Sequence, residues 1–140
     1  MRRRNSTSAI EQFMANFRKE RDFYASATGI AHDICEGIVR SNAIRAIVTS
    51  RVKRIDRLEE KLLKRNERKK YRNVEEIRDD IPDLAGIRIA LYFPGDIERM
   101  CTLVEENFLV VGTKKFPKDG NRAKHKTYEP RFEGYKANHF

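Results

Sequence analysis

Apolar side chains recur every three or four residues through the first part of the chain. From about Ser8 to Arg40 this spacing predicts helix, and a break at residues 28–29 (Thr-Gly) predicts two helices rather than one. A strongly amphipathic helix is expected from Ile55 to about Lys70, and a short one from Asn73 to Asp80, which ends before Pro82. The first half of the chain is therefore predicted to be mostly helical.

Short runs rich in apolar and β-branched residues predict strands after these helices. They lie at residues 44–50, 84–93, 109–116 and 134–140. One more helix, with Asp96 placed to cap it and an apolar stripe along one side, is expected between the second and third strands. This order predicts an α+β (mixed α/β) fold, in which a mixed β-sheet is flanked by helices.

Charge and cysteine content narrow the classes of partner and compartment. The chain has 30 Lys and Arg against 21 Asp and Glu, a net charge of +9 that favours a polyanionic partner: nucleic acid, a nucleotide or an anionic membrane surface. No run approaches the roughly 20 apolar residues of a membrane span, and the start lacks the apolar region of a secretory signal. Two cysteines, Cys35 and Cys101, are too few for a disulfide framework or a zinc site. A soluble cytoplasmic protein with reduced, buried thiols is expected.

The helix predicted within residues 51–72 separates basic and apolar side chains onto two faces. This segment has eleven basic and four acidic residues. Lys53, Arg57, Lys61 and Arg65 repeat at four-residue intervals, an arrangement that costs a few tenths of a kcal/mol per pair unless an anion lies across it. A solvated surface and a docking surface for a triphosphate or a nucleic-acid backbone both fit this pattern.

The segment from Asp83 to Arg88 combines a strand with two charged residues. Alternation along this strand puts the following residues on a core face: Ala85, Ile87, Ile89, Leu91 and Phe93. On the other face Arg88 lies between two small residues, which leaves room for a ligand; the alternative is a salt bridge to Asp79 or Asp80. Asp83, at the start of the strand, fits either a turn cap or a ligand of a hard cation.

The end of the chain, Gly-Tyr-Lys-Ala-Asn-His at residues 134–139, carries an aromatic ring and an imidazole. If this segment is extended, Tyr135 and His139 lie on the same face. Such a pair suits stacking on a base and contact with its sugar or phosphate. The alternative interpretation is that both residues are simply half-buried in a strand and bind no ligand.

Taken in order, these segments resemble the synthetase domain of the RelA/SpoT family, the enzymes that make the alarmones ppGpp and pppGpp. The matching stretches are Arg51-Val-Lys53 with Lys61, Asp83-Leu-Ala-Gly-Ile-Arg88, Tyr-Phe-Pro-Gly-Asp at 92–96, and Gly134-Tyr-Lys-Ala-Asn-His139. The resemblance covers residues 45–140 and leaves residues 1–44 as an N-terminal helical segment. It implies a nucleotidyltransferase-like synthetase domain.

By this resemblance the protein is a GTP diphosphokinase, which transfers pyrophosphate from ATP to the 3′-hydroxyl of GTP or GDP. The resemblance assigns ATP binding to Arg51, Lys53, Arg57, Lys61 and Arg88. It assigns catalysis to Asp83 and Arg88, with Asp83 as the ligand of Mg²⁺. It assigns the GTP or GDP site to Tyr135, Lys136 and His139. Such chemistry needs positive charge around the phosphates and a metal ion that bridges them.

Two departures from the family pattern affect these expectations. Arg57 stands where the family usually has a serine. The family also carries a catalytic glutamate on a strand after the Gly-Tyr motif, and the chain ends at Phe140 before it. The synthetase domain is therefore expected to be incomplete at its C-terminal end. His32-Asp33 lacks the other ligands of the family's hydrolase domain.

Two further functions compete with alarmone synthesis. One is a guanine-nucleotide-binding module without catalysis, and the other, less favoured, is an RNA- or DNA-binding protein that uses the 51–72 helix and a basic loop within residues 114–126. Related stand-alone synthetases often form oligomers, but no heptad pattern here is long enough to argue for one.

Overall fold

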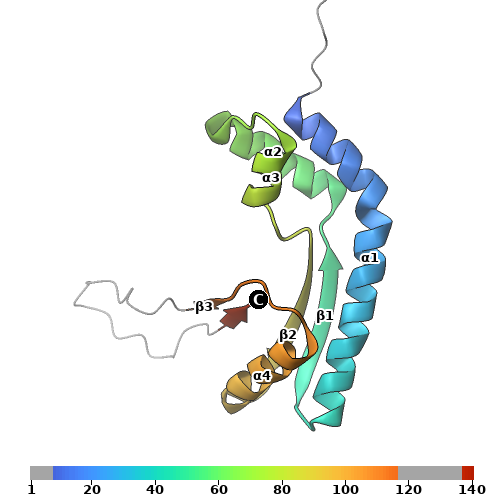
Figure 1. Ribbon diagram of the computed structural model, residues 1–140, viewed down its shortest axis with the longest axis vertical. Coiled ribbons are helices and arrows are strands. Elements are labelled where there is room, and N and C mark those ends of the chain that lie inside the picture. Colours follow the sequence, from blue (N-terminus) through green and yellow to red (C-terminus); the bar gives the residue numbers. More distant parts are fainter. Residues whose placement is uncertain (1–7, 117–136) are drawn as a thin grey trace, which may run out of the picture. The chain divides into compact units, whose positions relative to one another are not determined.

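A computed structural model describes residues 8–116 and 137–140, and the chain divides into two compact units between Tyr92 and Phe93 (Figure 1). The first unit contains α1 (Ala9–Ser41), β1 (Ala46–Val52), α2 (Ile55–Lys69), α3 (Val74–Asp80) and β2 (Ala85–Leu91). The second contains a 3₁₀ turn, η1 (Pro94–Asp96), then α4 (Ile97–Asn107), β3 (Lys114–Phe116) and β4 (Ala137–His139). Helices combined with small antiparallel sheets agree with the predicted α+β class.

Local sequence signals set the ends of the helices in the first unit. α1 begins with a capping box, in which the Glu11 amide donates to Ser8 Oγ at 3.1 Å and the Ser8 amide donates to the Glu11 carboxylate at 2.9 Å. α3 begins where Asn73 Oδ1 accepts from the Glu76 amide at 2.9 Å. α2 ends at Lys69, and its C-cap residue Lys70 has a φ of 51°, in the left-handed region.

α1 runs unbroken through Thr28 and Gly29, where the sequence predicts a break. The Thr28 hydroxyl donates to the Tyr24 carbonyl at 2.6 Å, so this group is satisfied within the helix. A glycine costs a helix about 1 kcal/mol. That cost is smaller than the gain from burying side chains such as Phe17 and Cys35 on either side of it, at about 1.5–3 kcal/mol for each large one. Tertiary packing therefore outweighs the local signal, and the prediction of two helices is wrong.

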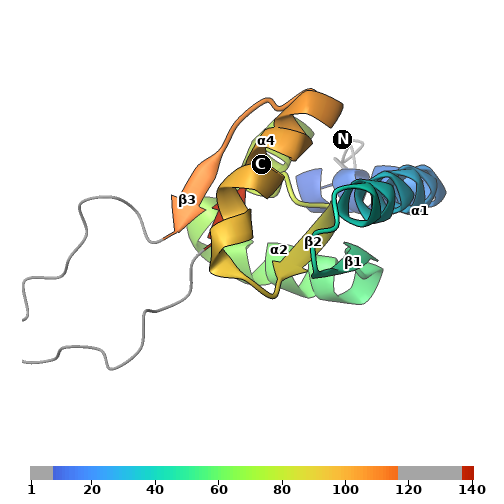
Figure 2. The same cartoon turned by 90° about the horizontal axis from the view of Figure 1, so that it is seen from below.

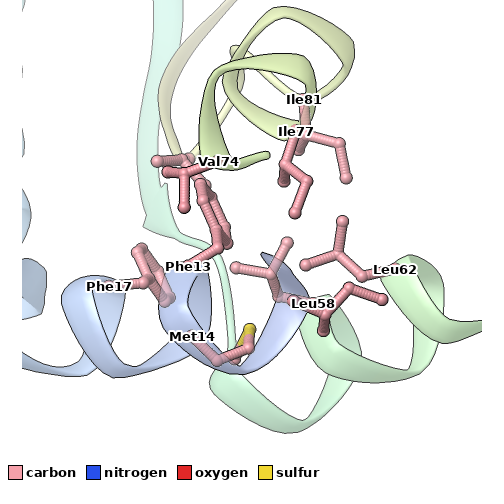
Figure 3. Packing of buried hydrophobic residues seen from close by; sticks show 10 residues of the cluster. Phe13, Met14, Phe17, Leu58, Leu62, Val74, Ile77 and Ile81 are labelled. Atoms are coloured by element: carbon pink, nitrogen blue, oxygen red, sulfur yellow. The ribbon is translucent and has the colours of Figure 1, made fainter. Parts of the chain in front are cut away.

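The core of the first unit lies where α1, α2 and α3 meet. Its buried residues are Ile10, Phe13, Met14, Phe17, Leu58, Leu62, Val74, Ile77, Ile81 and Leu84. Figure 3 shows side chains from the three helices converging in this cluster. Because α1 supplies its largest side chains, the N-terminal helix is an integral part of this unit.

β1 and β2 form an antiparallel pair with α1 along one face. The register places Val48 opposite Ile89 and Arg51 opposite Gly86. α1 packs against both strands, as Figures 1 and 2 show, and Val48 is buried on the face that it covers. His32 of α1 adds a polar link, because its Nε2 donates to the Val48 carbonyl at 3.2 Å.

The opposite face of this pair, called here the outer face, carries exposed residues. They are Ile47, Thr49, Arg51, Gly86, Arg88 and Ala90. The predicted alternation along β2 is confirmed from Ala85 to Leu91. Phe93, which was expected on the core face, lies beyond the strand and is exposed.

The second unit confirms its predicted helix but shortens a predicted strand. Met100 of α4 is buried, and Asp96 occupies the N-cap position without a side-chain hydrogen bond. The strand expected at 109–116 is limited to β3, because Leu109 and Val111 are 94% and 95% exposed and pair with none of the described strands. β3 pairs antiparallel with β4. The pairing is thus antiparallel throughout the described part of the chain, whereas one mixed sheet was expected.

Both cysteines are free thiols, as expected. Cys35 is buried, and its burial raises the pKa of the thiol, whereas Cys101 is half-buried and its Sγ accepts from Asn138 Nδ2 at 2.9 Å. Among the described residues, no helix is long and apolar enough to cross a membrane.

Adjacent leucines of α2 test the position of the core. Leu62 is completely buried, whereas its neighbour Leu63 is 56% exposed. We expect Leu62→Ala to lower the free energy of unfolding by about 2–5 kcal/mol, and Leu63→Ala to change it by less than about 0.5 kcal/mol. Urea unfolding followed by circular dichroism measures both. Equal losses in the two variants would contradict this packing.

Candidate functional site

Lys53 and Asp83, two residues that sequence motifs placed in one site, form a direct ion pair. Lys53 follows the last residue of β1, Asp83 precedes β2, and the Lys53 amide donates to the Leu84 carbonyl at 2.8 Å. The strand pairing thus brings together two residues that are 30 positions apart in the sequence. Lys53 Nζ donates to Asp83 Oδ2 at 3.0 Å, and the two side chains are 16% and 55% exposed. The lysine is held in a sheltered position, and the carboxylate faces solvent.

Lys61 of α2 joins this pair. Burial lowers the pKa of its ammonium group, the nearby charge of Lys53 lowers it further, and Asp83 acts in the opposite direction. Burial raises the pKa of Asp83, but the hydrogen bond and charge of Lys53, together with the charge of Lys61, outweigh that effect and leave it lowered. Two ammonium groups and one carboxylate therefore share one location, which we call the Lys53–Lys61–Asp83 cluster.

Positive charge exceeds negative charge at this cluster. One carboxylate compensates two ammonium groups, and the mutual repulsion of Lys53 and Lys61 costs free energy that an added anion would offset. The arrangement can hold phosphate oxygens between the two lysines, and Asp83 Oδ1 can face a cation. Within residues 8–116 and 137–140, no three His, Cys, Asp or Glu side chains gather around a position suited to a metal ion.

Arg51 and Arg88 lie together on the outer face of the β1–β2 pair. Arg51 is opposite Gly86 and Arg88 is opposite Thr49, so the two arginines occupy diagonal positions, about 7–8 Å apart at their backbones. Both are exposed, and neither forms an ion pair with a described residue. A Cβ added at Gly86 would meet nothing within 4 Å, so the open space expected beside Arg88 is present.

Three of the other basic residues of α2 have acidic partners within the chain: Arg57, Arg65 and Lys69. Arg57 donates to Glu60 at 3.2 Å, one helical turn away on an exposed surface. Arg65 donates to Asp80 at 2.8 Å. The row of like charges at four-residue intervals is thus compensated by this chain's own carboxylates at Lys53, Arg57 and Arg65, so the row by itself does not require an external anion. Lys61, by contrast, forms no ion pair among the described residues.

The residues predicted to bind the acceptor nucleotide belong to the second unit. Tyr135 and Lys136 lie outside the described residues. His139 is exposed on β4, opposite Lys114 of β3. Lys114 and Lys115 belong to β3, and the rest of the predicted basic loop lies outside the described part of the chain.

A second polar cluster, centred on Asp80, was not identified from the sequence. Asp80 accepts from Arg65 at 2.8 Å and from the Tyr71 hydroxyl at 2.5 Å, and Lys69 Nζ lies 3.1 Å from its other oxygen. The side chain of Asp80 is 15% exposed. The network joins α2, the α2–α3 turn and the end of α3, and so fixes the chain that leads to Asp83. The feature of the sequence that could have indicated this network is the pair of basic residues Arg65 and Lys69, which lie one helical turn apart on α2.

The Asp80 network shifts the pKa values of its members in opposite directions. Hydrogen bonds from Tyr71 and Arg65 hold the pKa of Asp80 well below its usual range. Burial, and then the hydrogen bond to Asp80, raise the pKa of Tyr71 to about 12. The stabilisation from Tyr71 is therefore complete below about pH 10 and is lost as the pH rises through the folded-state value.

No protein-family model, curated protein or solved structure matches this chain. The resemblance to the RelA/SpoT synthetase domain therefore stays a prediction.

The Asp80 network can be tested with neighbouring aspartates. Asp80→Asn removes the charge that three donors share, so we expect a loss of about 1–3 kcal/mol in the free energy of unfolding at neutral pH. Because the pKa of Asp80 is lowered in the folded state, this difference from the wild type should shrink as the pH falls below about 4. Urea unfolding at several pH values measures it.

Asp79→Asn is the matched control for this experiment. Asp79 is exposed and has no ion pair among the described residues, so its substitution should change the free energy of unfolding by less than about 0.5 kcal/mol. An equal loss in the two variants, or a loss in Asp80→Asn that does not depend on pH, would show that the network is not a source of stability.

Proposed function

We propose that the Lys53–Lys61–Asp83 cluster is the polyphosphate-binding part of an alarmone synthetase site, in which the chain transfers pyrophosphate from ATP to the 3′-hydroxyl of GTP or GDP. The observation that carries the proposal is the meeting of Lys53 and Lys61 at Asp83. Lys53 and Lys61 belong to the basic segment at 51–72, and Asp83 belongs to the separate segment at 83–88. Their convergence supports a common role.

The roles of the lysines follow from charge. A triphosphate placed between Lys53 and Lys61 would relieve their repulsion and accept hydrogen bonds from both ammonium groups. Displacement at phosphorus spreads negative charge over the equatorial oxygens, and fixed cations stabilise that charge most in the transition state. Lys53 is sheltered and paired with Asp83, so it would shift from that carboxylate toward the phosphates to do this.

The two arginines of the outer face suit the base and the remaining phosphates. Guanidinium groups stack on aromatic rings and bind phosphate in a bidentate manner. Arg51 and Arg88 flank the space beside Gly86, on the strands that lead into the Lys53–Lys61–Asp83 cluster. The proposal therefore assigns adenine and phosphate contacts to these arginines. Arg57, which Glu60 engages on the surface, would have to leave that ion pair to reach ATP.

Asp83 fits a magnesium site that the nucleotide completes. Mg²⁺ usually keeps several waters and binds one or two carboxylates together with substrate phosphates, so one exposed carboxylate is an adequate protein contribution. When bound there, Mg²⁺ would neutralise phosphate charge. The Lys53 ammonium already occupies Asp83 Oδ2, so a cation and the lysine compete for this carboxylate unless phosphates draw the lysine toward them. Asp83 is thus proposed to hold the metal only together with the nucleotide.

The acceptor half of the proposed site rests on the family resemblance alone. Tyr135 would stack on guanine, and Lys136 and His139 would contact the acceptor's phosphates. The proposal includes a nucleotidyltransferase-like arrangement of the synthetase domain.

Substitution of two lysines of α2 distinguishes a specific phosphate contact from general electrostatic attraction to a basic helix. Lys61→Met removes the ammonium at the cluster, whereas Lys64→Met removes an exposed one that forms no ion pair with described residues. In calorimetry with Mg²⁺ and α,β-methylene-ATP, we expect Lys61→Met to weaken binding about tenfold or more, and Lys64→Met to change it less than about twofold. Equal effects, or no binding by the wild type, would contradict the proposal.

Pyrophosphate transfer is tested separately from binding. Labelled ATP and GDP, incubated with the protein and Mg²⁺, should yield 3′-pyrophosphorylated guanosine on thin-layer chromatography, and Asp83→Asn should abolish it. Binding of the ATP analogue without any product would favour the nucleotide-binding module. A nucleic-acid-binding protein would instead bind RNA or DNA with a steep salt dependence, a slope of several units in log K against log salt.

A further inference from the structure

A cavity of about 170 Å³ lies in the first unit, away from the outer face. It lies between the N-terminal half of α1, Arg78 near the end of α3 and the residues that lead into β2. Its apolar lining includes the buried side chains Phe13, Phe17, Ile81 and Leu84. An apolar cavity of about 150 Å³ is large enough to hold a benzene molecule. The space therefore fits one apolar group of about the size of a phenyl ring or a branched alkyl chain.

Polar side chains of opposite charge line the same cavity. Glu20 lies on α1, with Asn16 one helical turn before it, and Arg78 lies on α3. Both charged residues are exposed. Among the described residues, neither Glu20 nor Arg78 forms an ion pair, with each other or with any other group. A carboxylate and a guanidinium thus line one apolar cavity, and neither has an ion-pair partner in the described part of the chain.

We infer that this cavity binds a small zwitterion with an apolar side chain, an α-amino acid of the phenylalanine or leucine type. The Arg78 guanidinium would bind the carboxylate in a bidentate manner, and Glu20 would accept from the ammonium group. The side chain would occupy the apolar part of the cavity, against Phe17. An occupant with only one charge would leave either Glu20 or Arg78 uncompensated, so a zwitterion fits the lining better.

The position of the cavity links an occupant to the chain around Asp83. Pro82 and Leu84, the two neighbours of Asp83, both line it. A bound amino acid would therefore contact the segment that carries this carboxylate. The binding inference itself does not depend on the proposed function, because it concerns other side chains and can be measured without a nucleotide.

Calorimetry with L-phenylalanine and L-leucine tests the inference. The wild type should bind at least one of them saturably, and Arg78→Ala and Glu20→Gln should each weaken binding about tenfold or more. Both residues are exposed, so these variants should keep the wild-type unfolding midpoint. Arg68→Ala and Glu75→Gln, which remove exposed charges that do not line the cavity, are the matched controls and should bind as the wild type does.

Two analogues assign each charge of the ligand to its partner. 3-Phenylpropionate lacks the ammonium group, so its binding should respond to Arg78→Ala but not to Glu20→Gln. Phenethylamine lacks the carboxylate and should show the reverse. The inference is overturned if neither amino acid binds at up to about 10 mM, where even a millimolar Kd would register. It is also overturned if both charge variants bind the amino acids as well as the wild type does.

Discussion

The contact of α1 with α2 and α3 is the constraint on which the rest of the first unit depends. Phe13, Met14 and Phe17 fill the space between the two shorter helices, and Leu58 and Leu62 close it from α2. α2 has a long basic surface and only a narrow apolar stripe, so its apolar contact with the core depends on few side chains. Burial of these side chains therefore fixes where the basic residues of α2 lie.

The candidate site follows from that packing together with one strand pairing. The core sets the position of α2 and so of Lys61, and the antiparallel register of β1 and β2 brings Lys53 next to Asp83. The Asp80 network holds the turn between these elements through three donors. The core thus positions Lys61, and the strand register positions Lys53 and Asp83. The apolar core and the hydrogen-bonded strands hold the backbone around the cluster in place. The cluster itself is partly exposed to solvent.

Much of the local structure could be predicted from the sequence, because periodic burial produced it. The helix from Ile55 to Lys69 and the alternation along β2 followed directly from their patterns. The break expected at Gly29 did not occur, since long-range packing on both sides of the glycine decides that case and no local signal reports it. The strand expected at 109–116 is limited to residues 114–116, since apolar composition alone does not specify a pairing partner, and Leu109 and Val111 pair with none of the described strands.

The candidate site could be predicted only in part from the sequence. Residue types and motif order selected Lys53, Lys61 and Asp83, but their contact depends on strand register, which the sequence does not state. Asp80 was considered only as a partner for Arg88, and its actual partners come from α2 and the following turn. The cavity with Glu20 and Arg78 could not have been predicted, because it joins helices that are far apart in the chain.

A crystal structure of the chain with Mg²⁺ and α,β-methylene-ATP would test most directly whether the Lys53–Lys61–Asp83 cluster binds a triphosphate. We expect the β- and γ-phosphates to lie between Lys53 Nζ and Lys61 Nζ, with Asp83 facing the metal and the Lys53–Asp83 contact of 3.0 Å lengthened. A structure in which the nucleotide binds elsewhere while that ion pair stays intact would contradict it.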